Sequence, residues 1–308
     1  MNPIARVGNW MRSIRQDLSY VRQGVADAKI LSAKLLIQAR AGETFQDLTE
    51  TEFKVFSQFG EDGIIQYLIR KAAIPRDCQY FVELGVQDYS EANTRFLLIN
   101  DNWRGLVMDA ANMSAVRASG LYARHELTAR SAFIDRDNIN GLIADAGFGG
   151  SIGLLSIDID GNDYWVWERI SIVDPIIVIV EYNGVFGSTR AVTVPYDPAF
   201  KRSVAHSSGL YWGCSLRALE LLARRKGYAL VGSNRAGNNA FFVKRDHLNG
   251  QPELTAAQAY YEPRFRESQD RTGVRTFLSG TARLKAIVDM PLFDVERNET
   301  VKVGDLLE

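Results

Sequence analysis

Short apolar runs alternate with stretches of helical periodicity over residues 55–245, and this alternation constrains the fold more than any other feature. The runs at residues 154–157 and 176–180 are almost continuously apolar. A strand with one face in water would alternate apolar and polar residues, so these two strands are predicted to be covered on both faces. Helices on each side of a mostly parallel sheet provide that cover. The predicted parallel strands are residues 80–84, 105–108, 129–134, 153–157 and 176–181.

Two further strand candidates, residues 228–231 and 240–243, are joined by a loop rich in Gly, Asn and Ser. Such a pair predicts a β-hairpin, and hence an antiparallel pair that closes the sheet. A doubly wound sheet ending in a hairpin is the Rossmann-like arrangement of class I methyltransferases, whereas most dinucleotide dehydrogenases end in parallel strands. By this analogy the predicted fold class is α/β, with a Rossmann-like class I methyltransferase sheet and a long N-terminal helix.

Residues 4–40 are predicted to form one long helix, because apolar residues recur there at spacings of three and four. This apolar seam consists of Ile4, Val7, Met11, Ile14, Leu18, Val21 and Val25. We expect residues 1–45 to dock on the chain's own domain or to pair with a second subunit in a homo-oligomer. Basic residues outnumber acidic ones in this segment, so peripheral contact with an anionic membrane surface is the alternative.

The length of 308 residues, 46% of them hydrophobic, suffices for one large core and a modest appendage. We predict a main domain at residues 52–250 and a C-terminal extension at residues 251–308.

The formal net charge of −1 gives no reason to expect nucleic acid as a partner. Cys78 and Cys214 match neither a disulfide framework nor zinc-ligand spacing, so reduced thiols in a cytoplasmic protein are expected. No apolar run has the length of a transmembrane span, and the N-terminal segment lacks a secretory signal's apolar core.

An acidic residue follows or ends every predicted parallel strand. Ligands of an open parallel sheet bind beyond the carboxyl ends of its strands. A carboxylate buried there is costly unless something pairs with it, so this series predicts a polar ligand or a metal. The acidic residues are Glu83, Asp109, Asp135, Asp158 and Glu181.

Gly85 follows the first strand and would let the backbone approach a ligand closely, although a tight turn would explain it equally well. Asp109 is placed to hydrogen-bond a ribose diol, as in many nucleotide sites. Residues 85–90 lack the glycine-rich turn that a pyrophosphate requires, which disfavours a dinucleotide. S-adenosylmethionine has no phosphate and tolerates bulkier residues there. The predicted cofactor contacts are Glu83, Gly85, Asp109, Asp135 and Asp158; an oxidoreductase that binds NAD or a nucleotide sugar is the alternative.

The chain resembles the FkbM-like methyltransferases, in particular a bacterial branch, over roughly residues 55–245. The resemblance is carried by FSQFGEDG at 56–63, FVELG at 81–85, WRGL at 103–106, SIDIDGNDY at 156–164, EYN at 181–183, GCSL at 213–216 and GNNAFFV at 237–243. It implies an S-adenosylmethionine-dependent O-methyltransferase whose small-molecule or glycan acceptor is a sugar or another hydroxylated compound, with surface-polysaccharide biosynthesis as one setting. Gln87 stands where many methyltransferases carry a second glycine, and Gln87 and Tyr89 would suit a degenerate, non-catalytic scaffold.

Asp158, Asp160 and Glu181 are predicted to hold a divalent cation. Asp158 and Asp160 project to one side of an extended strand, and Glu181 ends the neighbouring strand. Carboxylates are hard ligands suited to Mg²⁺, Ca²⁺ or Mn²⁺, and a bound cation would lower the pKa of an acceptor hydroxyl. The alternative is that Asp158 faces the methionine part of the cofactor while Asp160 and Asp163 cap the next helix.

His206 and Asp163 are the two candidates for a catalytic base. His206 lies in the long segment 186–212, and loops of this length at the ligand end of a sheet are usually functional. The ordinary pKa of histidine suits proton abstraction, although a lone loop histidine is more often structural. Asp163 competes for the role because it follows a predicted cation ligand by three residues.

Overall fold

The computed structural model describes residues 3–307 of the chain, which form two compact units divided between Thr44 and Phe45. The first unit contains the predicted long helix, α1 (Pro3–Ala39). A single helix cannot bury its own seam, and Met11, Leu18, Val21 and Val25 are exposed. The side chains of Ile4 and Val7 lie outside those that the structure describes. Within residues 3–307, no helix combines the length and apolarity needed to cross a membrane.

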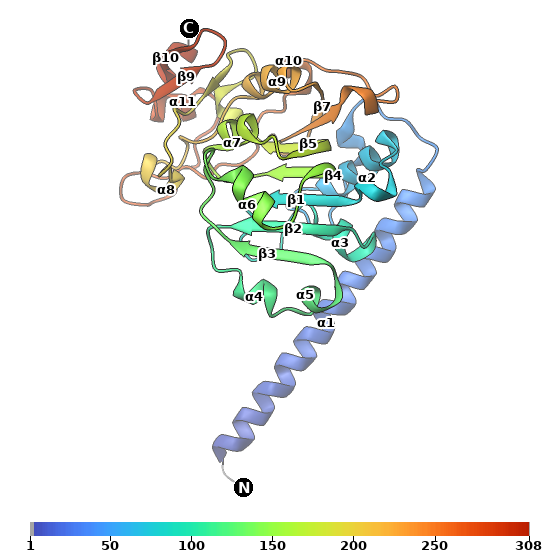
Figure 1. The fold of residues 1–308 in the computed structure, drawn as a ribbon. Helices are drawn as coiled ribbons and strands as arrows, with labels where there is room; N and C mark the ends of the chain where they lie inside the picture. Colours follow the sequence, from blue (N-terminus) through green and yellow to red (C-terminus); the bar gives the residue numbers. More distant parts are fainter. Residues whose placement is uncertain (1–2, 308) are drawn as a thin grey trace. The chain divides into compact units, whose positions relative to one another are not determined.

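The second unit is built on a seven-stranded sheet with the order β3-β2-β1-β4-β5-β8-β7 (Figure 1). The first five strands are parallel, and β8 is antiparallel to both β5 and β7. The predicted fold class and closing hairpin are therefore confirmed. The strands are β1 (Tyr80–Leu84), β2 (Arg104–Asp109), β3 (Leu127–Ser131), β4 (Gly150–Ile157), β5 (Val173–Glu181), β7 (Tyr228–Ser233) and β8 (Asn239–Lys244).

Both faces of this sheet are covered, as the apolar strands predict. Alternate residues of β5 enter different cores: Val178 and Val180 pack with α6, α7 and α9, whereas Ile177 and Ile179 pack with α2 and α3. This period of two is the pleat of a strand whose two faces are both buried. The covering helices are α2 (Glu61–Ala72), α3 (Arg95–Asn100), α4 (Ser114–Arg117), α5 (Gly120–Arg124), α6 (Ile139–Asp145), α7 (Asp163–Arg169) and α9 (Leu216–Arg225).

A smaller three-stranded sheet, β10-β9-β6, joins the long loop after β5 to the end of the chain. Its strands enclose a third apolar cluster with α11. Residues 251–307 therefore belong to the same compact unit as the large sheet. The remaining elements are η1 (Leu48–Thr51), η2 (Arg76–Cys78), η3 (Gly184–Phe186), β6 (Val192–Thr193), α8 (Arg202–Ala205), η4 (Arg245–His247), α10 (Ala256–Ala259), α11 (Thr281–Ala286), β9 (Pro291–Asp294), β10 (Glu299–Lys302) and η5 (Val303–Leu306).

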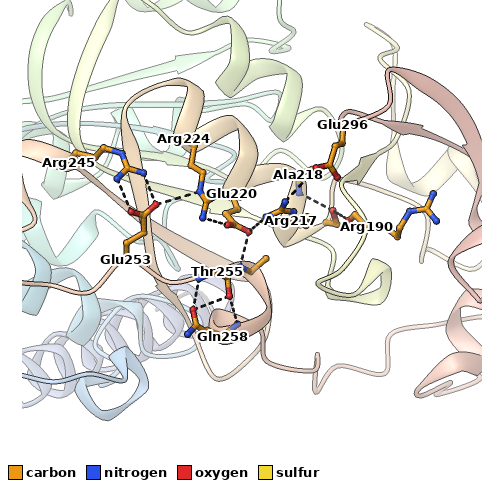
Figure 2. Close-up of polar contacts among 12 residues, drawn as sticks. Arg190, Arg217, Ala218, Glu220, Arg224, Arg245, Glu253, Thr255, Gln258 and Glu296 are labelled. Atoms are coloured by element: carbon orange, nitrogen blue, oxygen red, sulfur yellow. Dashed lines mark hydrogen bonds and ion pairs between the residues drawn. The ribbon is translucent and has the colours of Figure 1, made fainter.

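Figure 2 shows the polar network that attaches the start of this C-terminal extension to α9. Glu220 is 1% exposed and accepts hydrogen bonds from Arg217 at 2.9 Å and from the backbone N–H of Ala256 at 2.9 Å. Arg224 forms an ion pair with the same carboxylate at 2.8 Å. A buried carboxylate is tolerated only where such partners surround it, so this network fixes the position of α10.

Candidate functional site

Two cavities of about 260 Å³ each lie at the carboxyl ends of the parallel strands. The first, the β2-side cavity, is lined from the end of β2 and from the loops after β1, β3, β4 and β5. The second, the β5-side cavity, is lined from the end of β5, the loop between β7 and β8 and the C-terminal extension. The two share Gln87, Asp158 and Asp160, so one polar wall separates two ligand-sized spaces.

Gly85 lies beside that wall, where the backbones that follow β1 and β4 meet. Its φ is +81°, and a Cβ at this position would lie 1.5 Å from the carbonyl oxygen of Asp158. The backbone N–H of Gly85 donates to Met108 at 2.8 Å, and that of Asp158 donates to Leu84 at 3.0 Å. The glycine is thus required by the close approach of β1 and β4, and it also lines the β2-side cavity.

Asp109 lies at the end of β2 and borders the β2-side cavity, as predicted for a residue that meets a ligand at this edge. Its two carboxylate oxygens accept hydrogen bonds from the backbone N–H groups of Gln87 at 2.7 Å and Ala111 at 2.6 Å. A carboxylate has about four lone-pair sites, so two hydroxyl groups of a ligand could still donate to it.

Glu83 is held by the chain itself and is absent from the lining of the β2-side cavity. It is 4% exposed and accepts hydrogen bonds from the backbone N–H groups of Asn93 at 2.8 Å and Thr94 at 3.0 Å. Burial raises the pKa of Glu83 to about 7. These hydrogen bonds hold the loop before α3 in place. Glu83 also borders a smaller pocket of about 120 Å³, together with Gln58.

Asp135 lies outside both cavities, contrary to its predicted contact with a cofactor. Strand β3 ends at Ser131, three residues earlier than predicted, so Asp135 belongs to the following turn. Its carboxylate accepts hydrogen bonds from the backbone N–H groups of Asp137 and Asn138, each at 2.8 Å. Phe133 and Ile134 line the β2-side cavity instead.

The carboxyl groups of Asp158 and Glu181 lie within hydrogen-bonding reach of each other in the wall of the β5-side cavity. Burial raises the pKa of both groups. The negative charge of Asp158 raises the pKa of Glu181 further, whereas the hydrogen bond with Glu181 lowers the pKa of Asp158. Glu181 is 8% exposed, and its Oε2 has no hydrogen-bond partner among the described residues. An acid pair of this kind retains one shared proton and leaves one oxygen free for a ligand.

Asp160 is bound by an arginine rather than facing a cation. Arg202 donates to Asp160 Oδ1 at 2.7 Å and to Glu267 Oε2 at 2.8 Å, and its guanidinium carbon lies 4.6 Å from the centre of the Trp212 ring. Among residues 3–307, no group of three or more His, Cys, Asp or Glu side chains is arranged to hold a metal ion. Asp158, Asp160 and Glu181 all line the β5-side cavity, but the described residues do not arrange them as the predicted cation site.

The two predicted catalytic bases, Asp163 and His206, line neither cavity. Asp163 is fully buried and accepts hydrogen bonds from the backbone N–H groups of Ile159 at 2.8 Å and Gly161 at 2.9 Å. Burial raises the pKa of Asp163 to about 6. The Nδ1 atom of His206 accepts the backbone N–H of Ser208 at 3.2 Å. Both side chains shape the loops that carry them, which is the structural interpretation considered above for each.

The sequence prediction did not include Arg202, Phe265 and Arg283 in the β5-side cavity. Phe265 packs on Phe59 with ring centres 4.6 Å apart, and Arg283 projects from α11. No local pattern identifies these residues, because the chain brings them to the sheet from far along the sequence. Gln58, which also lines the cavity, lies within the first motif of the family resemblance.

No protein-family model matches the chain, and no curated protein matches it in sequence. Membership of the FkbM-like family therefore stays a prediction. Solved structures with a similar fold include a provisionally assigned hemolysin from Lactococcus lactis, which is 13% identical in sequence. The match covers 63% of this chain and 92% of that one, with a TM-score of 0.37. An O-methyltransferase from Bacillus cereus in complex with S-adenosylhomocysteine is 16% identical; the match covers 72% of this chain and 95% of that one, with a TM-score of 0.35. An O-methyltransferase family protein from Burkholderia thailandensis is 13% identical; the match covers 70% of this chain and 71% of that one, with a TM-score of 0.35. Likenesses this distant do not identify the function.

Proposed function

We propose that the chain is an S-adenosylmethionine-dependent methyltransferase that acts on a hydroxyl group of a sugar or another hydroxylated small molecule. The observation that carries the proposal is the pair of cavities that meet at Asp158, at the carboxyl ends of a sheet closed by an antiparallel hairpin. Transfer between two substrates requires two neighbouring spaces with one shared boundary. Carboxylates around these cavities also favour a ligand that carries a positively charged sulfonium.

The residues of the β2-side cavity suit the nucleoside part of this cofactor. Asp109 would accept the ribose hydroxyls, and Phe133 and Ile134 provide apolar surface for the adenine. Asn162 also lines this cavity, is 4% exposed, and its Oδ1 has no hydrogen-bond partner among the described residues. A buried acceptor without a partner is costly, so a ligand amino group that donates to Asn162 would remove that cost.

The acid pair Asp158 and Glu181 is the general base of the proposed reaction. When bound, the cofactor supplies a methyl group that leaves sulfur for an acceptor oxygen. The acceptor hydroxyl donates to the free oxygen of the pair, which takes up the proton as the new carbon–oxygen bond forms. A positioned base contributes about 10²–10⁴-fold to the rate of such a step. In this proposal the acid pair takes the role of base that the sequence predicted for His206 or Asp163, neither of which lines a cavity.

The first test is a calorimetric titration of the full chain with S-adenosylhomocysteine. We expect Asp109→Ala to weaken binding by about 10²-fold or more, because it removes two charge-assisted hydrogen bonds to the ribose. Asp145→Ala is the matched control, since Asp145 is exposed and borders neither cavity, so its loss should leave the affinity unchanged.

Equal losses in the two variants would contradict this placement of the ribose. If S-adenosylhomocysteine does not bind the unmodified chain, NAD should be titrated next. NAD binding would support the oxidoreductase, and failure of both ligands would support the scaffold. Parallel titrations with Mg²⁺ and with EDTA test the cation: unchanged affinity agrees with the Arg202–Asp160 ion pair.

The exposed seam of α1 supports self-association as a second proposal. Burying Met11, Leu18 and Val21 against a second copy would remove their apolar surface from water. We expect the full chain to have the mass of an oligomer in light scattering, and a variant without residues 1–44 to have that of a monomer. The truncated variant should keep its affinity for S-adenosylhomocysteine, because both cavities lie in the second unit. A monomeric mass for both forms would refute the proposal.

A further inference from the structure

We infer that the acceptor carries an oxyanion, a carboxylate or a phosphate, in addition to its reacting hydroxyl, and that Arg283 binds this group. The inference rests on the proposed function and names the chemical class of the molecule that enters the β5-side cavity. It also assigns a task to the C-terminal extension, which supplies Arg283 to a cavity at the edge of the large sheet.

Arg283 is a buried cation with unused hydrogen-bonding capacity. It lines the β5-side cavity and is 5% exposed. Its Nη2 donates to the carbonyl of Pro263 at 3.1 Å and to Glu262 at 3.3 Å, but its Nε has no hydrogen-bond partner among the described residues. A guanidinium binds carboxylate and phosphate through adjacent N–H groups, so a cavity-lining arginine with an unpaired donor suits such a ligand.

The positive charge of Arg283 is only weakly compensated by the protein. Glu262, the one ion-pair partner of Arg283 among the described residues, has a side chain that is 67% exposed and is therefore well screened by water. A cation taken out of water without a close anion is unfavourable. The second guanidinium of the cavity, Arg202, already binds Asp160 and Glu267, so Arg283 is the better site for a ligand anion.

The rest of the cavity restricts where the anion can lie. The acid pair of Asp158 and Glu181 would repel a negative group, whereas the free Glu181 Oε2 would accept a hydrogen bond from a hydroxyl. An acceptor with a hydroxyl at the acid pair and an oxyanion at Arg283 satisfies both buried atoms at once. A neutral sugar would satisfy Glu181 but would leave the exposed Glu262 as the counterion of Arg283.

The test uses the full chain saturated with S-adenosylhomocysteine and three probes: D-glucuronate, D-glucose 6-phosphate and D-glucose. Binding of each is measured by saturation-transfer NMR titration. We expect at least one anionic sugar to bind about tenfold or more tightly than glucose. The carboxylate and phosphate probes then show which oxyanion the cavity prefers.

Three variants separate the role of Arg283 from a general charge effect. Arg283→Met should abolish the preference for the anionic sugar. Lys285→Met, which removes an equal charge from an exposed position on the same helix outside the cavity lining, should preserve it. Glu262→Gln should tighten binding of the anionic sugar several-fold, because it removes a competing carboxylate without disturbing a buried residue.

The inference is overturned if glucose binds as tightly as both anionic sugars, if none of the three binds, or if Arg283→Met leaves the preference intact. Arg283→Met must retain its affinity for S-adenosylhomocysteine, which shows that the cavities have kept their shape. Should that variant unfold, the response to Glu262→Gln decides the outcome. Failure of the unmodified chain to bind S-adenosylhomocysteine would refute the proposed function instead, so the two failures are distinguishable.

Discussion

Replacing Gly85 with alanine is expected to lower the free energy of unfolding by more than about 4 kcal/mol, or to prevent folding altogether. The added Cβ would lie 1.5 Å from the carbonyl oxygen of Asp158, which is backbone and cannot rotate away. Relief would require β1 and β4 to separate at the point where Asp158 donates to Leu84. The measurement is urea denaturation followed by far-ultraviolet circular dichroism.

Gly147→Ala is the matched control for this prediction. Gly147 also has a positive φ, +80°, but a Cβ there would meet no atom within 4 Å. Its replacement should therefore lower the free energy of unfolding by only about 1–2 kcal/mol, the cost of holding alanine in a left-handed backbone conformation. If the two variants lost equal stability, the close approach of β1 and β4 would not be the reason for Gly85. A folded Gly85→Ala protein should also bind S-adenosylhomocysteine poorly, because its cavity wall would have moved.

Glu181→Gln is expected to stabilise the protein at neutral pH while removing the proposed base. The substitution keeps the shape of the side chain and removes a buried acid that must take up a proton, or hold a negative charge beside Asp158, when the chain folds. Replacing uncompensated buried charge by neutral groups can add about 1–4 kcal/mol of stability. The same change should lower the rate of methyl transfer by about 10²–10⁴-fold.

The stability gain from Glu181→Gln should depend on pH in a defined direction. The pKa of Glu181 is raised in the folded state, so the folded chain binds the proton more tightly than the unfolded chain does. Stability of the unmodified protein therefore falls as pH rises from about 4.5, the ordinary pKa of the group, towards the raised folded pKa. The difference between variant and parent should consequently be larger at pH 8 than at pH 5.

Denaturation midpoints at these two pH values provide the measurement. Glu168→Gln is the control, because Glu168 is exposed and should show nearly the same stability difference at both. A Glu181→Gln protein that is less stable than its parent at pH 8 would show that the carboxylate is well compensated in the fold. In that case Glu181 would be a structural anchor, and the acid pair would not hold a shared proton.

The secondary structure of the large sheet was predictable because it is encoded locally. Strands β4 and β5 were recognisable from uninterrupted apolar runs, and the closing hairpin from its turn-rich loop. The edge at which the site would lie followed from the parallel arrangement alone. Asp109, Asp158 and Glu181, which the sequence places at strand ends, line these cavities.

Which partner each polar side chain binds depends on the tertiary structure. Asp135 and Asp163 differ little from Asp158 in sequence context, yet their carboxylates accept nearby backbone N–H groups instead of facing a cavity. Asp160 is neutralised by Arg202, which lies more than forty residues away in the sequence. Arg283 reaches the site only because β9 pairs with both β6 and β10 beside α11. Periodicity along a chain records which face of an element is buried, whereas the partner of a polar group depends on distant segments that only folding brings together.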